Sequence, residues 1–150
     1  AVGVRQFVLG ARQTNDAPSS ITRLGDLGGP AYMIRATVLG VMAQRLIRTL
    51  CPHCKQATET DVQAWEELVR PFKMKPPEKT YRPVGCLECR DTGYLGRVGV
   101  YETMPLNTSL KNHISRGSEL ETLTRQALKN GMKPLRISGA LKVPTGLTTV

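Results

Sequence analysis

The sequence reads CPHC at residues 51–54 and CLEC at residues 86–89, and it contains no cysteine outside these two stretches. A C-x2-C pair places two thiolates on one tight turn, where they can share a tetrahedral metal ion, and a second pair completes the coordination shell. Zinc suits such a site best, because four thiolates leave no open position for a substrate. We therefore predict a structural zinc site with the ligands Cys51, Cys54, Cys86 and Cys89.

Two other uses of the cysteines compete with zinc. A pair of disulfides would need an oxidising compartment, and no stretch of the sequence resembles a secretory signal. A thioredoxin-like redox site normally uses one C-x-x-C motif rather than two. His53 lies between two predicted ligands, but with four cysteines present we expect it not to bind the metal. Residues 55–85 exceed the commonest spacing of a zinc ribbon, so we expect them to form an insertion.

Composition limits the size and class of the protein but not its partner. The 150 residues suit one domain or two small ones, and aromatic residues make up only 5% of the chain, so aliphatic side chains must fill the core. The formal charge of +9 is compatible with nucleic acid, nucleotide phosphates, anionic lipid or an acidic protein. No apolar run is long enough to span a membrane. We expect the chain to be a piece of a longer protein.

The residues before the first cysteine pair predict one short strand and two helices. Residues 5–10 form an apolar run of the strand type. Asn15 or Asp16 can cap a first helix that has Pro18 in its first turn and ends at Gly28. Pro30 then begins a longer helix that we expect to reach Leu50, because apolar side chains recur at spacings of three and four residues.

The residues from the insertion onward predict a helix, a loop, a strand and more helix. Thr60 opens a capping box before a helix that contains Trp65, and prolines make residues 73–83 a loop. The stretch 93–102 alternates as a strand. The last third is predicted to be helical, with one helix at residues 110–115 and a second that is capped by Ser118, has Glu121 in its first turn and ends at Gly131.

Several of these stretches together resemble the C-terminal part of the secretion ATPases that drive type II secretion and type IV pilus assembly. The matching stretches are TNDAPSSITRL at 14–24, QRLIR at 44–48, the two cysteine pairs and TGYLGRVGVYE at 92–102. A closing segment follows, with GM at 131–132, LKV at 141–143 and GLTT at 146–149. Each stretch alone is weak, but their order is that of the family. Secretion and pilus members share these motifs, so the sequence does not choose between them.

The resemblance implies an α/β fragment in three parts. Residues 1–50 would be the end of a P-loop NTPase core, 51–104 a tetracysteine zinc-binding subdomain, and 105–150 a C-terminal helical subdomain. The longer parent would be a homo-hexameric ATPase that uses ATP and Mg2+ on the cytoplasmic face of the inner membrane. Its implied partner is the inner-membrane platform protein of the secretion or pilus machine.

The sequence lacks the parts that would make the fragment active alone. It contains no G-x-x-x-x-G-K-[ST] loop and no apolar strand that ends in Asp-Glu, so the phosphate cradle and the magnesium carboxylates are missing. We therefore predict no catalytic residue and no ATP hydrolysis by the fragment. Gln13 stands where the family has its His box, and a glutamine can orient water or phosphate but cannot shuttle a proton near neutral pH.

Arg45 is the one candidate nucleotide contact. It follows a glutamine where related P-loop ATPases place a nucleotide-sensing arginine, and a guanidinium fits phosphates. The alternative is that Arg45 only covers surface. Because the predicted helix would run from Pro30 into Cys51, we hypothesise that it moves the cysteine lobe as a lever; the competing interpretation is that zinc only staples the insertion.

A zinc-ribbon module that binds nucleic acid is the alternative function. Such modules usually interleave aromatic residues with Arg and Lys to stack bases. This chain has a single tryptophan, Trp65, and its neighbours Glu66 and Glu67 are acidic. The motifs therefore favour the ATPase, and we expect no nucleic-acid partner.

Overall fold

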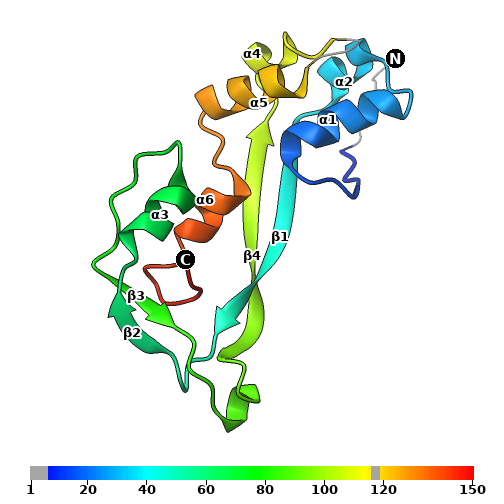
Figure 1. Ribbon diagram of the computed structural model, residues 1–150. Coiled ribbons are helices and arrows are strands. Elements are labelled where there is room, and N and C mark those ends of the chain that lie inside the picture. The colour runs from blue at the N-terminus through cyan, green and yellow to red at the C-terminus, as the bar shows by residue number, and fades with distance from the viewer. Residues whose placement is uncertain (1–6, 116–118) are drawn as a thin grey trace.

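The computed structural model describes residues 7–115 and 119–150. Its longest elements are the antiparallel strands β1 (Gly40–Leu50) and β4 (Tyr94–Pro105), which form a two-stranded ribbon through the length of the molecule (Figure 1). The helices of residues 17–37 and 108–129 gather at one end of this ribbon, and the cysteine-bearing loops lie at the other end (Figure 1). The fold thus places a group of helices and the cysteine-bearing loops at opposite ends of one β ribbon.

The strand β1 replaces the second half of the helix that the sequence predicts from Pro30 to Leu50. Helix α2 (Ala31–Thr37) ends early, and Gly40–Leu50 pairs with β4 instead. The prediction is wrong because the apolar positions of this stretch fit both periods, and pairing with a distant strand decides between them. A rigid helical lever into Cys51 is therefore absent, since a strand leads into the first cysteine pair.

Helix α1 (Ala17–Asp26) begins as predicted. The Asp16 carboxylate accepts a hydrogen bond from the Ser19 N–H at 2.7 Å, Pro18 lies in the first turn, and Gly28 follows the helix with φ of +91°. The apolar face packs against α2, β1 and α5. The core at this end of the ribbon consists of Ala17, Ile21, Ile34, Ala43, Met104, Leu106, Leu110, Ile114, Leu123, Ala127 and Met132.

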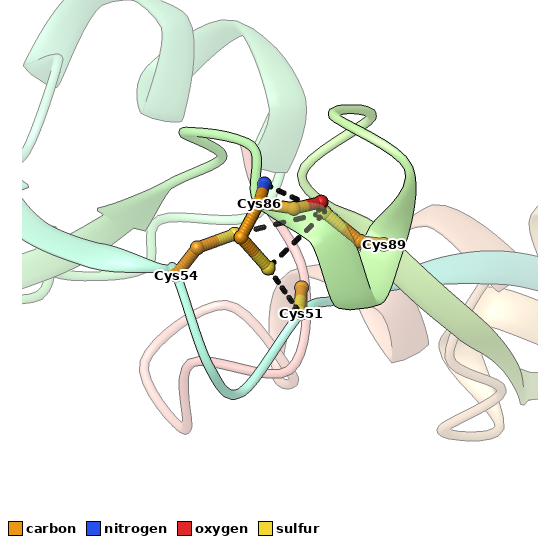
Figure 2. Close-up of side chains that lie close together, drawn as sticks. All are labelled: Cys51, Cys54, Cys86 and Cys89. Carbon is orange, nitrogen blue, oxygen red and sulfur yellow. Dashed lines mark hydrogen bonds between the residues drawn. The ribbon is translucent and has the colours of Figure 1, made fainter.

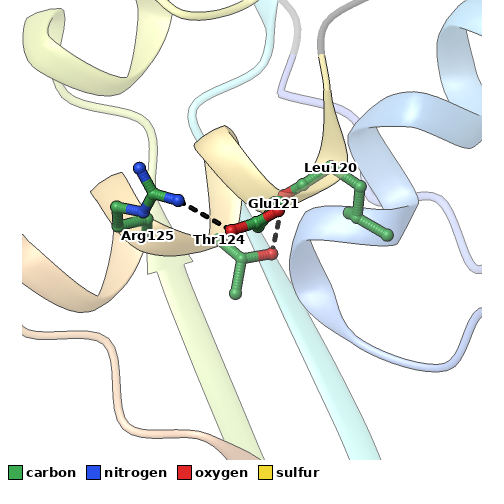
Figure 3. Close-up of polar contacts among 4 residues, drawn as sticks. All are labelled: Leu120, Glu121, Thr124 and Arg125. Atoms are coloured by element: carbon green, nitrogen blue, oxygen red, sulfur yellow. Dashed lines mark hydrogen bonds and ion pairs between the residues drawn. The ribbon is translucent and has the colours of Figure 1, made fainter.

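The helices after β4 match the sequence prediction in part. The helix predicted at 110–115 is the shorter α4 (Thr108–Lys111). Helix α5 (Leu120–Lys129) ends before Gly131 as expected, but the predicted cap Ser118 lies outside the described residues. The Glu121 carboxylate pairs with the Arg125 guanidinium at 2.7 Å, one turn along the exposed face of α5 (Figure 3). Such an exposed pair stabilises a helix by less than about 0.5 kcal/mol.

The insertion between the cysteine pairs forms a second small lobe. Helix α3 (Val62–Val69) is capped by Asp61, one residue later than predicted, because Thr60 donates its hydroxyl hydrogen bond to the Pro77 carbonyl instead. Trp65 is buried against α6 (Leu135–Ala140), a helix in addition to the two that the sequence predicts in the last third of the chain.

One predicted loop contains a strand, and one predicted strand is irregular where the structure describes it. The predicted loop at 73–83 contains β3 (Lys79–Arg82), which pairs with β2 (Gln56–Glu59) across the insertion. In the predicted strand at 5–10, residues 7–10 have no regular structure, and the first two residues lie outside the described part of the chain. A strand needs a partner, and neither sheet among the described residues offers one to that run. Within the described residues, no helix has the length and apolar character to cross a membrane.

Candidate metal centre

The four predicted cysteine ligands converge at the end of the ribbon opposite α1, α2, α4 and α5 (Figures 1 and 2). All four sulfur atoms lie within 4.8 Å of one another. The Sγ–Sγ distances are 3.8 Å for Cys51–Cys86, 3.8 Å for Cys54–Cys89 and 3.7 Å for Cys86–Cys89. A tetrahedron with Zn–S bonds of about 2.3 Å has edges of about 3.8 Å, whereas a disulfide has an S–S distance of about 2.05 Å. The spacing fits four thiolates around one ion.

The first cysteine pair lies on a turn that follows directly from β1. The N–H of Cys51 donates to the Gly93 carbonyl at 2.9 Å, and the N–H of Lys55 donates to the Cys51 carbonyl at 3.1 Å, which closes the turn. Cys51 is buried and Cys54 is half-buried. His53 is exposed and does not belong to the cysteine cluster, in agreement with the sequence prediction.

The second cysteine pair lies on the 3-10 turn η1 (Leu87–Cys89), between Gly85 and Gly93. Gly93 has φ of +73°, and a Cβ atom there would lie 2.3 Å from the Cβ of Pro83, so only glycine fits. Gly85 has φ of +115°, and a Cβ atom there would lie 2.9 Å from the Asp91 carbonyl oxygen. Both glycines therefore allow close packing of the chain around the second cysteine pair, Gly93 against Pro83 and Gly85 against Asp91.

Backbone N–H groups point at the sulfur atoms. Gly85 donates to Cys54 Sγ at 3.3 Å, Gly93 donates to Cys89 Sγ at 3.2 Å, and Cys86 donates to Cys89 Sγ at 3.3 Å. An N–H that points at sulfur favours the thiolate over the thiol. The site thus provides the charged form of cysteine, which is the form that binds metal.

The two thiols of the second pair differ in acidity. Burial raises the pKa of Cys89, but the N–H groups of Gly93 and Cys86 and the neighbouring thiols together lower it to about 6. For Cys86, the N–H of Cys89 lowers the pKa, while burial and the thiols of Cys89 and Cys54 raise it above its ordinary value. One cysteine therefore ionises readily, and a bound cation would displace the other protons. The donor set fits a soft, tetrahedral metal ion with no open coordination position.

The other two predicted site residues lie away from the cysteines. Arg45 is in the middle of β1, where its guanidinium donates to the Thr14 carbonyl at 3.3 Å, the Asn15 carbonyl at 3.4 Å and Asn15 Oδ1 at 3.2 Å. The structure therefore joins two of the stretches on which the family resemblance depends. Gln13, which directly precedes Thr14 in the sequence, is exposed.

Three residues near the cysteines are not among the predicted site residues. Gly85 and Gly93 donate to the sulfur atoms, and Lys55 is fixed by a carbonyl near the C-terminal end of the sequence. The glycines were detectable, because a glycine directly before or shortly after a C-x2-C pair is typical of a turn that brings N–H groups to sulfur. The Lys55 contact had no local signal, since its partner lies 91 residues away.

Comparison with known proteins finds similarity along nearly the whole chain. The family described as "Type II/IV secretion system protein" matches residues 5–150. The type IV pilus assembly ATPase TfpB of Acinetobacter baylyi is 50% identical over 144 residues, which cover 96% of this chain and 25% of that protein. The type IV pilus assembly ATPase PilB of Myxococcus xanthus is 39% identical over 96% of this chain and 26% of its own length.

Relatives named for secretion are similar as well. The type II secretion system protein E of Pectobacterium carotovorum is 37% identical over 143 residues, which cover 95% of this chain and 28% of that protein. The chain therefore spans about a quarter of the length of the relatives that it matches.

Proposed function

This chain belongs to the type II/IV secretion system protein family, and we propose on that basis that it is the C-terminal part of a longer ATPase that powers type II secretion or type IV pilus assembly. The observation that carries the proposal is the similarity to both kinds of relative over 95–96% of the chain. This similarity also favours the ATPase over a nucleic-acid-binding module. The longer protein would bind ATP and Mg2+ through residues that precede this chain.

We propose a structural role for the cysteine cluster. It would hold one zinc ion that joins the end of β1 to the turn before β4, and thereby closes the insertion of residues 55–85 onto the ribbon. Within this insertion only Trp65, Val69 and Thr80 are buried. Structural zinc can supply on the order of 10 kcal/mol of folding free energy in such sites, which a small core cannot. We therefore favour a purely structural role for the zinc over the transmission of movement by a helix, because the residues that would form the second half of this helix are the strand β1.

The remaining parts of the proposal concern the longer protein. It would work as a homo-hexamer on the cytoplasmic face of the inner membrane and would act on the platform protein. Within this chain, residues 1–50 would complete the P-loop core and 105–150 would form the helical subdomain. Arg45 would sense the nucleotide, because it is held beside Thr14 and Asn15 and no described carboxylate pairs with it. Gln13 would orient a water or a phosphate.

The test is the longer protein itself. Its reading frame should encode a P-loop and an apolar strand that ends in Asp-Glu upstream of these residues, and the purified protein should hydrolyse ATP only with Mg2+. A Cys54→Ser variant should lose its zinc and its stability. If the frame encodes no P-loop and the protein does not bind ATP, the proposed ATPase is wrong. Binding of DNA or RNA would favour the ribbon module instead.

A further inference from the structure

The closing turn, defined as residues 146–149 (GLTT), is held against the first cysteine pair. The N–H of Leu50 donates to the Leu147 carbonyl at 2.8 Å, and Nζ of Lys55 donates to the Gly146 carbonyl at 2.8 Å. Leu50 directly precedes Cys51, and Lys55 directly follows Cys54. Two consecutive carbonyls of one turn therefore hold both ends of the cysteine pair.

Further contacts fix the same turn to the ribbon. The Thr148 hydroxyl donates to the Arg48 carbonyl at 3.1 Å, and the hydroxyls of Thr149 and Tyr94 lie 3.5 Å apart. The Arg48 guanidinium stacks over the Tyr94 ring, 4.1 Å from its centroid. Thr148 is buried. The closing turn thus has both backbone and side-chain contacts with the strands that carry the metal site.

Gly146 lets the closing turn come this close. Its φ is +68°, and a Cβ atom would lie 2.9 Å from two ring atoms of Tyr81 and 3.0 Å from Nζ of Lys55. The Lys55 ammonium in turn lies 5.0 Å from the Tyr81 ring centroid. A side chain at position 146 would therefore displace the lysine or the tyrosine that the turn holds in place.

The residues just before the closing turn are anchored in the core that α3 and α6 form. The N–H of Gly146 donates to the Val143 carbonyl at 2.9 Å. Val143 is fully buried with Trp65, Val69, Ile137 and Ala140. The turn therefore connects the core formed by α3 and α6 to the first cysteine pair.

We propose that the closing turn is a positioning element for Cys51 and Cys54, so that docking of the turn and retention of the metal strengthen each other. This inference rests on the proposed metal centre. Fixing Leu50 and Lys55 restricts the first cysteine pair to the geometry in which its sulfur atoms face those of the second pair. Because linkage is reciprocal, a bound metal also holds the turn in place. The GLTT motif would therefore position the first cysteine pair, a role that goes beyond the proposed ATPase function.

The test compares two glycine substitutions in the 150-residue chain loaded with Co2+, whose thiolate charge-transfer absorption reports four-sulfur coordination. Gly146→Ala should release Co2+ to EDTA about tenfold faster than wild type, as is usual when groups that support metal ligands are removed. Gly131→Ala is the matched control, because its φ is +90° and nothing lies within 4 Å of the added Cβ. It should release Co2+ close to the wild-type rate.

Substitution of Lys55 provides a second, independent test, because it places no strain on the backbone. Lys55→Met should speed release and also speed hydrogen exchange at the Leu50 amide, whose acceptor is in the closing turn. Lys55→Arg, which keeps a donor, should restore both, and these two variants decide the matter if Gly146→Ala does not fold. Equal release from Gly146→Ala and Gly131→Ala, or wild-type release from Lys55→Met, overturns the inference. A wild-type chain without the charge-transfer band would overturn the metal centre itself.

Discussion

The buried carboxylate of Glu102 accepts a hydrogen bond at 2.8 Å from the backbone N–H of Ala17, which lies 85 residues away in the sequence. Its second oxygen accepts from the N–H of Leu135 at 3.2 Å. Ala17 is the first residue of α1 and Leu135 the first of α6, so one side chain satisfies an otherwise unpaired amide at the start of two helices. Glu102, near the C-terminal end of β4, therefore links the core around α1 to the core formed by α3 and α6.

Replacing this carboxylate should destabilise the fold. Glu102→Gln keeps the shape but directs an NH2 group at one of the two donors, and losing a buried hydrogen bond to a charged group costs about 2 kcal/mol. Urea unfolding would measure the change. Glu59→Gln, an exposed glutamate in β2, is the control and should change the free energy of unfolding by less than about 0.5 kcal/mol. Equal effects of the two substitutions would show that Glu102 is not the link described here.

Gly93 should tolerate no side chain. In Gly93→Ala, the added Cβ would overlap Pro83 and move the N–H away from Cys89 Sγ. Gly28→Ala is the control, since Gly28 also has positive φ but has open space around it. We expect Gly93→Ala to cost about 1–3 kcal/mol more than Gly28→Ala, as overpacking usually does, and to lower the metal content. Thermal unfolding and elemental analysis would check both, and matching values for the two variants would refute the steric argument.

Arg45 should matter for the nucleotide more than for the fold. In the longer protein, Arg45→Ala should weaken binding of a fluorescent ATP analogue while changing the free energy of unfolding by about 0.5 kcal/mol or less. Arg45→Lys should not restore binding, because a compact ammonium does not reproduce the planar guanidinium that fits phosphates. Arg97→Ala, on the other strand, is the control. Wild-type affinity in Arg45→Ala would remove Arg45 from the nucleotide site.

The 150-residue chain alone should not hydrolyse ATP. It lacks the loop that cradles phosphates and the carboxylates that hold magnesium. Phosphate release by the purified chain should therefore stay at the level of a protein-free blank with Mg2+ present, whereas the longer protein should be active. Magnesium-dependent turnover that follows the chain through two purification steps would contradict this prediction.

The cysteine cluster could be predicted from sequence because its signal is local. Each C-x2-C pair forms its own turn, and the metal chemistry of thiolates requires the two turns to meet. The cap of α1 is equally local, since Asp16 bonds to Ser19 three residues later. Recognition of the family rested on the same kind of short stretch.

The strand β1 could not be predicted because its partner is remote. Residues 40–50 have apolar side chains that suit a helix, and only pairing with β4, which begins at Tyr94, makes them a strand. The closing turn and Glu102 depend on contacts between residues that are 33 to 100 positions apart, for the same reason. Such contacts leave no trace in local periodicity, so the elements that join the two lobes escape prediction from sequence.

Elemental analysis of the purified chain tests most directly whether the four cysteines hold one structural metal ion, as we propose. We predict about one zinc per chain in the wild type, and loss of both zinc and cooperative unfolding in Cys51→Ser and Cys86→Ser. A chain that stays fully folded after chelation, with no zinc and four thiols that react freely, would contradict it.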